Sequence, residues 1–344
     1  MKKWSTPPQA DELEVCIYGP GIGESILVHI GNSQWLCIDS AKSKHTAWPL
    51  VYLSELGLDP AKCIKLIVAT HWHADHVDGL SQIVEACPGV QFVCSEAVTV
   101  AEFKQILQLP IVNTDVLKSA HREIRQVFRT IVNRFKADPL HPVAIHAGLN
   151  KRLAPELNVE IWALSPSPAD LARSKLEFQN LYDPSAAPTA AIKENTECVV
   201  LYIKIGDQVL LLGSDLEHNN HPQSGWKSVL AAPIRNTPAS MFKIPHHGSE
   251  GAHSPSIWTT ALQQAAIAVV TPYTRSTLPQ QNQLDLYTVQ SQTTFATALP
   301  KAVSVTRPPA VAKRTLNRIK AAYAVNQDMS FVRLRKKAGE HWQA

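Results

Sequence analysis

The chain has 344 residues, of which 45% are hydrophobic and 18% charged, and its mean hydropathy is −0.10. This composition excludes an intrinsically disordered protein and is typical of a globular protein with a substantial core. The formal net charge of +4 permits a polyanionic partner without requiring one. No apolar run approaches the ~18 residues of a membrane span, and no apolar segment follows the N-terminal lysines as in a secretory signal. A protein of the cytoplasm without membrane association is therefore expected.

The six cysteines are scattered through apolar stretches and form no CxxC pair. Isolated cysteines of this kind are usually small buried side chains in a reducing compartment.

The first 95 residues predict short strands alternating with helices. Apolar and β-branched runs bounded by glycine and proline predict strands at 12–19, 25–30, 34–40, 63–70 and 90–95. Helical spacing predicts helices at 45–58 and 80–87. The run at 63–70 is continuously apolar, which indicates a strand buried on both faces of a sheet.

Residues 96–140 predict a helical insertion that becomes basic toward its end. Apolar residues fall at helical spacing between 124 and 135. The basic residues of this segment fall on roughly one or two faces of the predicted helix: Lys118, Arg122, Arg125, Arg129, Arg134 and Lys136. A basic helix face is suited to phosphate contacts, although a solvated amphipathic helix is the plainer interpretation.

The second half again predicts strands. These lie at 158–165, at 197–215 as a hairpin around Gly206 and Asp207, at 239–249, at 265–273 and at 329–337. Residues 166–191 predict a helix combined with a proline- and alanine-rich surface loop, and 254–262 has helical spacing. Because no fixed-period repeat or second core is visible, one domain is expected over 1–300. A basic extension over 301–344 is expected to pack on this domain or trail from it, and its segment from Arg307 to Lys337 is a second candidate for phosphate contacts.

The decapeptide THWHADHVDG at 70–79 concentrates metal-ligand side chains directly after a predicted buried strand. It supplies His71, His73, Asp75 and His76. Alternate residues leaving a strand point to one side, so His71 and His73 are placed to share one cation, with Asp75 and His76 facing an adjacent one. Imidazole and carboxylate ligands suit zinc, manganese or iron, and a dication relieves the repulsion between carboxylates.

This decapeptide resembles the HxHxDH signature of the metallo-β-lactamase superfamily, and further landmarks follow in that family's order. Asp39 ends an early strand where the family has an aspartate that supports the metal loop. LLLGSD resembles the strand presenting a bridging carboxylate, which nominates Asp215. FKIPHHGS resembles the late loop that carries the last histidine.

The resemblance implies an α/β fold, the αββα four-layer sandwich, with two divalent metal ions, Zn²⁺ or Mn²⁺, at one edge of two facing sheets. His71 and His73 would hold the first metal, Asp75 and His76 the second, and Asp215 would bridge them. The late loop offers His246 and His247; the family pattern favours His247 as ligand, with His246 lining the site.

One departure from the family concerns the first metal. Where hydrolytic members usually carry a histidine before the strand that precedes the bridging aspartate, this chain has NTEC, with Asn195 at that place. Because asparagine is a poor zinc ligand, the first site is expected to be weak, water-filled or occupied by an oxygen-preferring ion such as manganese. His121, His141 and His146 are alternative ligands, each more simply explained as an ordinary histidine.

A dinuclear site of this kind supports hydrolysis by a metal-activated water, with Asp75 orienting the water, and requires no serine or cysteine nucleophile. The second half resembles the hydrolase domain of DNA-uptake competence (ComEC-like) proteins, which implies phosphodiester chemistry on nucleic acid. Ser249, Tyr273 and Arg275 are candidate substrate contacts near the metal edge. A small-molecule esterase, thioesterase or lactonase, and a metal-poor binding module, are the alternatives.

Overall fold

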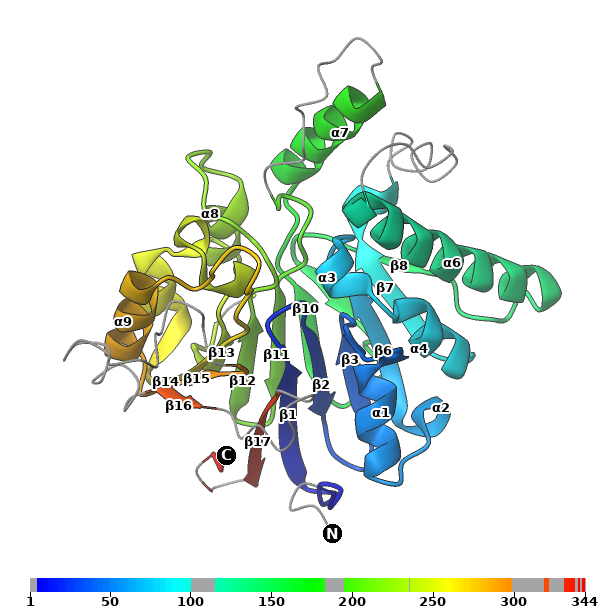
Figure 1. The fold of residues 1–344 in the computed structure, drawn as a ribbon, viewed down its shortest axis with the longest axis horizontal. Coiled ribbons are helices and arrows are strands. Elements are labelled where there is room, and N and C mark those ends of the chain that lie inside the picture. Colours follow the sequence, from blue (N-terminus) through cyan, green and yellow to red (C-terminus); the bar gives the residue numbers. More distant parts are fainter. Residues whose placement is uncertain are drawn as a thin grey trace.

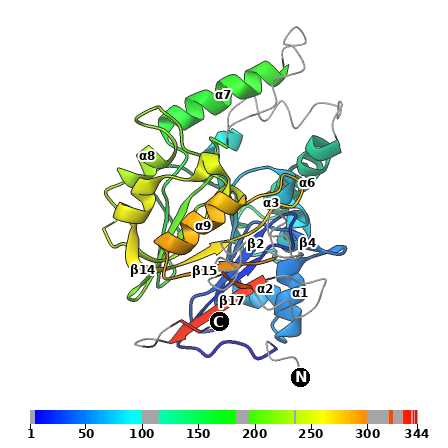
Figure 2. The ribbon, with the colours of Figure 1, turned by 60° about the vertical axis from the view of Figure 1, so that its left-hand side comes forward.

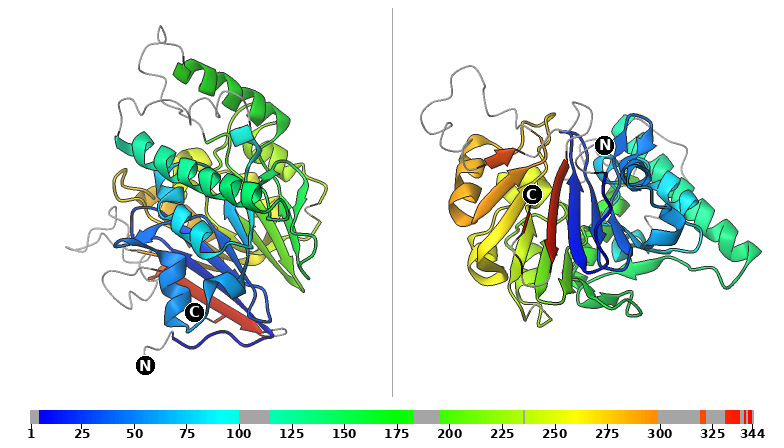
Figure 3. Two further views of the ribbon diagram at one scale, coloured as in Figure 1. Left: turned by 90° about the vertical axis from the view of Figure 1, so that its right-hand side faces the viewer. Right: turned by 90° about the horizontal axis from the view of Figure 1, so that it is seen from below.

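The computed structural model describes residues 5–99, 115–182, 195–234, 236–298, 319–321, 331–337, 340 and 342–343. Two large sheets face each other through the middle of the molecule, and helices cover their outer faces (Figure 1). The view from below shows the two sheets side by side with helices on either flank (Figure 3). The predicted four-layer αββα sandwich is therefore confirmed.

The first sheet has seven strands in the order β17-β1-β2-β3-β6-β7-β8. Strands β3, β6, β7 and β8 run parallel, whereas β17, β1, β2 and β3 pair antiparallel. The strand bounds are Phe331–Lys337 for β17, Glu12–Tyr18 for β1, Ser25–His29 for β2, Trp35–Ile38 for β3, Ile64–Ala69 for β6, Gln91–Ser95 for β7 and Ile145–Ala147 for β8.

The second sheet has eight strands in the order β16-β15-β14-β13-β12-β11-β10-β9. The strands from β9 to β12 pair antiparallel, and those from β12 to β16 run parallel. Their bounds are Lys151–Leu153, Glu160–Ala163, Leu201–Ile205 and Gln208–Leu212 for β9 to β12, then Ala239–Lys243, Leu262–Val270, Thr293–Ala296 and Ile319–Ala321 for β13 to β16. A small ribbon pairs β4 (Lys42–Ser43) with β5 (Thr46–Ala47).

The two-residue period of the strands divides the core into three layers. Val15 and Ile17 on β1 pack between the two sheets, whereas Cys16 and Tyr18 pack toward the helices outside the first sheet. On β12, Leu210 faces the core between the two sheets. Val209 and Leu211 face the opposite way and pack against the helices outside the second sheet. Since both faces of each sheet are covered, the strands read as continuous apolar runs.

The first sheet is covered by α1 (Trp48–Glu55), α4 (Leu80–Ala86) and α6 (Asp115–Ala137), and the second by α8 (Gly225–Leu230) and α9 (Gln281–Gln290). Helix α7 (Pro168–Tyr182) lies at the top of the molecule, beyond the strands (Figure 2). The remaining short helices are α2 (Pro60–Cys63), α3 (Ala74–Val77), η1 (Glu96–Thr99), η2 (His246–Gly248), η3 (Glu250–Ala252) and η4 (Ile257–Ala261). None of the helices in the described ranges is long and apolar enough to cross a membrane.

The predicted helical insertion appears as η1 and α6, and its residues 100–114 lie outside the described ranges. On α6, Ile124, Val127 and Ile131 are buried, whereas Val132 and Phe135 are exposed. The predicted helix at 254–262 is wrong in extent, because only the five-residue π-helical turn η4 forms before β14 begins at Leu262. All six cysteines are buried and free.

Most of the basic tail, including Arg307, lies outside the described residues. Its segment 331–337 forms β17, an edge strand of the first sheet that pairs with β1 along its full length. On this strand Arg335 forms ion pairs with Glu12 and Glu14. Arg335 therefore has a structural role.

Candidate metal centre

The predicted metal loop follows β6 at the end of the first sheet. The chain leaves the strand at Ala69 and turns at once into the short helix α3, whose N-cap is His73. Two backbone hydrogen bonds fasten this turn to neighbouring segments, from Ser40 N to the His76 carbonyl (2.7 Å) and from Glu24 N to the Asp75 carbonyl (2.9 Å). The predicted ligand side chains therefore project from a turn that is hydrogen-bonded to its neighbours.

The Asp39 carboxylate is hydrogen-bonded to the predicted metal loop. Its carboxylate accepts hydrogen bonds from Thr70 N (2.7 Å), the Thr70 hydroxyl (2.7 Å) and His76 Nδ1 (2.8 Å). Asp39 itself has a φ of 56°, in the left-handed region that aspartate tolerates better than most residues. This buried carboxylate therefore fixes the orientation of the His76 ring.

Two loops of the second sheet bring Asp215 and His247 to the same place. Asp215 follows β12, and His247 follows β13 in a turn where His246, His247 and Gly248 all have positive φ. Two adjacent non-glycine residues in this conformation store backbone strain of the kind that clusters at functional sites. His247 Nδ1 donates to the Thr271 carbonyl (2.9 Å), which fixes the ring.

Three imidazoles of this cluster share one arrangement. The Nδ1 atoms of His71, His76 and His247 each face an oxygen at 2.8 to 3.0 Å, from Thr70, Asp39 and Thr271 respectively. An Nδ1 that donates to an oxygen leaves Nε2 with its lone pair, which is how histidine ligands are usually prepared for a metal. The structure therefore presents three Nε2 atoms as potential ligands.

The Nε2 atoms converge on two carboxylates. His76 Nε2 lies 3.3 Å from Asp215 Oδ1, and His247 Nε2 lies 3.6 Å from Asp215 Oδ2 and 3.2 Å from Asp75 Oδ2. His71 Nε2 lies 4.0 Å from Asp215 Oδ2. Two ligands about 2.1 Å from one ion are roughly 3 to 4 Å apart, so these separations fit metal coordination. Asp215 has neighbours in both predicted sites, as a bridging carboxylate requires.

The burial and charge of the cluster also fit a divalent cation. His71 Nε2, His76 Nε2 and Asp215 Oδ1 are buried; within the described residues the first has no hydrogen-bond partner, and the other two face each other at 3.3 Å. Polar atoms left in this state cost free energy unless a ligand or ion satisfies them. A dication would provide the missing interaction and neutralise the neighbouring carboxylates.

The protonation states of the metal-free cluster follow from the same contacts. Burial, assisted by the neighbouring His76 and His73, holds the pKa of His71 well below its usual value. Burial also lowers the pKa of His76, but the carboxylates of Asp215 and Glu24 outweigh it and raise that pKa well above the usual value. For Asp215, burial raises the pKa, and the nearby His76 and His247 more than reverse this. Without metal, a proton on His76 balances part of the carboxylate charge.

Glu24 and Lys243 form a buried ion pair behind the cluster that sequence analysis missed. Glu24 Oε2 also accepts a hydrogen bond from the Thr271 hydroxyl (2.7 Å). Glu24 lies close enough to His76, Asp215 and His247 to count among possible metal ligands. However, its carboxylate is 3.9 Å from the Nδ1 atoms of His76 and His247, on the side opposite their Nε2 atoms. We therefore group Glu24 with Asp39 as a residue that lies behind the predicted ligands and holds them in place; we call these two residues the supporting layer.

His73 lies at the open side of the cluster, with 29% of its side chain exposed. Its ring packs edge-on against His71, with ring centroids 4.7 Å apart, and its Nε2 lies 3.9 Å from Oε1 of the buried Glu197. Sequence analysis also missed Glu197, which lies two residues beyond Asn195. The only sequence signal for a buried role of Glu197 was its position, as a charged residue at the start of an apolar run.

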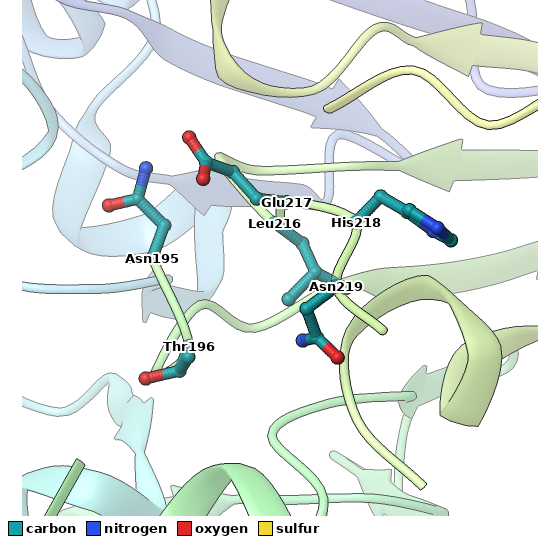
Figure 4. Close-up of a pocket in the computed structure, with 6 residues that line it drawn as sticks. All are labelled: Asn195, Thr196, Leu216, Glu217, His218 and Asn219. Atoms are coloured by element: carbon teal, nitrogen blue, oxygen red, sulfur yellow. The ribbon is translucent and has the colours of Figure 1, made fainter. Parts of the chain in front are cut away.

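Asn195 lines a neighbouring cavity of about 50 Å³ together with Thr196, Leu216, Glu217, His218 and Asn219. In Figure 4 the amide of Asn195 and the carboxylate of Glu217 extend toward the same side, whereas His218 points away. His246 turns toward this region, because its Nδ1 pairs with Glu217 Oε1 at 2.5 Å. Burial lowers the pKa of His246, but the Glu217 hydrogen bond outweighs it and raises that pKa.

The predicted substrate contacts lie around His247 and His246. The Tyr273 ring stacks on His247 with centroids 5.0 Å apart, Arg275 is exposed two residues further on, and the Ser249 hydroxyl is 3.1 Å from His246 Nδ1. The alternative histidine ligands lie elsewhere in the described structure. His121 is on α6, His146 is on β8, and His141 pairs with Asp138 at 3.2 Å.

The chain was compared with protein families, curated proteins and solved structures. No family model and no curated protein matches it. The metallo-β-lactamase fold protein YhfI from Bacillus subtilis is 12% identical, with a TM-score of 0.43, over 83% of this chain and 97% of that one. The likeness is distant.

Two further similar structures are a motif mutant of the metallo-β-lactamase from Cronobacter sakazakii and Zn²⁺-bound PqqB from Methylobacterium extorquens. The first is 14% identical, with a TM-score of 0.35, over 69% of this chain and 79% of that one. The second is 12% identical, with a TM-score of 0.35, over 67% of this chain and 69% of that one. The fold assignment for this chain rests on its own two sheets and three-layered core.

Proposed function

We propose that this protein is a metal-dependent hydrolase whose substrates are phosphodiesters, with nucleic acid as the substrate class. The observation that carries the proposal is the convergence of three oriented imidazole Nε2 atoms on Asp75 and Asp215, from distant parts of the chain. Two divalent metal ions bound there would supply a water of lowered pKa and polarise the scissile group.

The residues divide between two proposed metal positions. His71 and His73 would hold the first ion. The second ion would be held by Asp75, His76 and His247. Asp215 would contact both ions. Asp39, Thr70 and Thr271 keep the histidine rings in their ligating tautomer. Because Asp75 is the more exposed of the two carboxylates, it is the one placed to orient an attacking water.

Two basic features on the surface of the protein support a phosphodiester substrate. Helix α6 packs against α3, the helix that carries Asp75 and His76, and presents Arg122, Arg125 and Arg129 to solvent. Arg275 is exposed beside Tyr273 on the other side. Arginines flanking a metal centre are suited to hold phosphate groups on either side of a scissile bond. The resemblance of the second half to ComEC-like hydrolase domains points to the same substrate class.

The test is to incubate the full chain with Mn²⁺ and single- or double-stranded DNA. A panel of chromogenic phosphodiesters, esters, thioesters and lactones is assayed in parallel. We expect DNA and phosphodiester turnover by the wild type, loss of that turnover in His73→Ala, and retention in His141→Ala, a histidine outside the cluster.

Equal cleavage by the wild type and His73→Ala would refute metal-dependent catalysis at this site. Turnover of an ester, thioester or lactone without phosphodiester turnover would assign the centre to small-molecule hydrolysis. A metal-loaded protein that turns over none of these substrates would remove the proposal.

A further inference from the structure

We propose that Glu197 is the third protein ligand of the first metal ion, completing a set of two histidines and one carboxylate with His71 and His73. This inference rests on the proposed metal centre. From the sequence alone, Asn195 in NTEC is the residue expected at this position, which predicts a weak or water-filled first site. With Glu197 as the ligand, the first site has three protein ligands.

The backbone places Glu197 beside the metal loop. Val199 N donates to the Thr70 carbonyl (2.9 Å), so the segment that carries Glu197 runs alongside the residue immediately before His71. On the other side, the Ser95 hydroxyl donates to the Glu197 carbonyl oxygen (2.5 Å), which ties the segment to the end of β7. Glu197 is thus anchored between two strand ends of the first sheet.

The buried side chain of Glu197 lies beside His73. The Glu197 carboxylate is 1% exposed, and its Oε1 is 3.9 Å from His73 Nε2. The adjacent His71 Nε2 is buried without a hydrogen-bond partner in the described residues, so the histidine pair offers a lone pair that a metal ion would satisfy. The 3.9 Å separation is near the upper end for two ligands of one ion, so binding is expected to draw the two side chains together.

The geometry favours Glu197 over Asn195 for this role. Asn195 lies in the separate cavity beside Glu217, whereas Glu197 lies next to His73. A carboxylate is also the stronger ligand, because it brings a negative charge and two acceptor oxygens. Two histidines with one carboxylate form the donor set associated with ions such as iron(II), and oxygen donors also suit manganese.

The experiment measures bound metal directly, so it does not depend on knowing the substrate. The metal-free full chain is titrated with Mn²⁺ and followed by calorimetry and by electron paramagnetic resonance, which distinguishes coupled ion pairs from isolated ions. The variants are Glu197→Gln, Asn195→Ala and Glu217→Gln, the last being a nearby carboxylate outside the proposed ligand set.

We expect two ions per chain and a coupled signal from the wild type, Asn195→Ala and Glu217→Gln. Glu197→Gln should bind one ion tightly, with the affinity of the first position lowered about 100-fold or more and the coupling lost. Glu197→His, which keeps a ligand at this place, should restore two ions and raise the preference for Zn²⁺ over Mn²⁺ about tenfold or more.

Two coupled ions in Glu197→Gln, or loss of one ion in Asn195→Ala alone, would overturn the inference. A wild type that binds only one ion would overturn it as well. These outcomes are distinct from failure of the proposed function, in which the wild type binds its metal but hydrolyses no phosphodiester.

Discussion

Replacing Asp39 by asparagine tests how the supporting layer prepares a metal ligand. The Asp39 carboxylate accepts from Thr70 N on Oδ1, and from the Thr70 hydroxyl and His76 Nδ1 on Oδ2. In Asp39→Asn, the side-chain oxygen is expected to keep accepting the hydrogen bond from Thr70 N. The amide NH₂ group then replaces Oδ2 and faces His76 Nδ1. Two donors cannot face each other, so the neutral form of His76, the form that binds metal, is expected to switch to the tautomer protonated on Nε2.

This switch has separate effects on folding and on metal binding. Asparagine tolerates the φ of 56° at this position, so the backbone of the loop is expected to keep its conformation. The metal-free protein should lose about 1.5–3 kcal/mol of stability, the size of one hydrogen bond to a charged group. The proton on Nε2 blocks coordination, so metal affinity should fall about 10- to 100-fold, or about 1.4–2.7 kcal/mol.

The assay combines thermal unfolding of the metal-free protein with calorimetric titration of Mn²⁺ into the wild type and Asp39→Asn. A variant that melts close to the wild type but binds the second ion at least tenfold more weakly is the expected result. Unchanged metal affinity would show that Asp39 does not control His76, and the argument from tautomers would be refuted.

Three further outcomes are expected. Asp215→Ala should reduce bound metal from two ions to at most one and remove most hydrolysis, because both proposed positions lose a carboxylate; retention of two ions by metal analysis would contradict its bridging role. The folded-state pKa of His76 lies above its unfolded value, so its stabilisation of the metal-free protein is complete below pH ~6.5 and is lost as pH rises through the folded pKa. Melting temperatures of the metal-free wild type should therefore fall more steeply above pH 6.5 than those of His76→Asn, and equal slopes would exclude this assignment. Because all six cysteines are buried, and burial raises the pKa of Cys94 to about 12, alkylation at pH 8 should modify the native protein far more slowly than the denatured protein, as counted by mass spectrometry.

Much of the fold could be predicted because its signals are local. The continuous apolar run ending at Ala69 indicated a strand buried on both faces, and it lies inside the first sheet. The metal loop could be found because four of its ligand-type residues fall within six positions. The extent of the helix at 254–262 could not be judged from spacing alone, since the apolar residues from Leu262 onward belong equally well to a buried strand.

Three charged residues of the candidate centre escaped sequence analysis, and they share a physical feature. Glu24 directly precedes the apolar strand β2, Glu197 begins the apolar run that leads into β11, and Lys243 ends β13. Their partners are distant in sequence, as with the ion pair between Glu24 and Lys243, so no spacing pattern connects them. A charge within or beside a buried apolar run is costly unless paired, and this cost is the signal that would have identified them.

The most direct test of the central claim is anomalous X-ray scattering from a crystal of the protein grown with Mn²⁺. The account predicts two anomalous peaks within bonding distance of the cluster, one beside His71 and His73 and one beside Asp75, His76 and His247, with Asp215 in contact with both. Absence of any peak among these side chains, in crystals whose soaking concentration is saturating in solution, would contradict it.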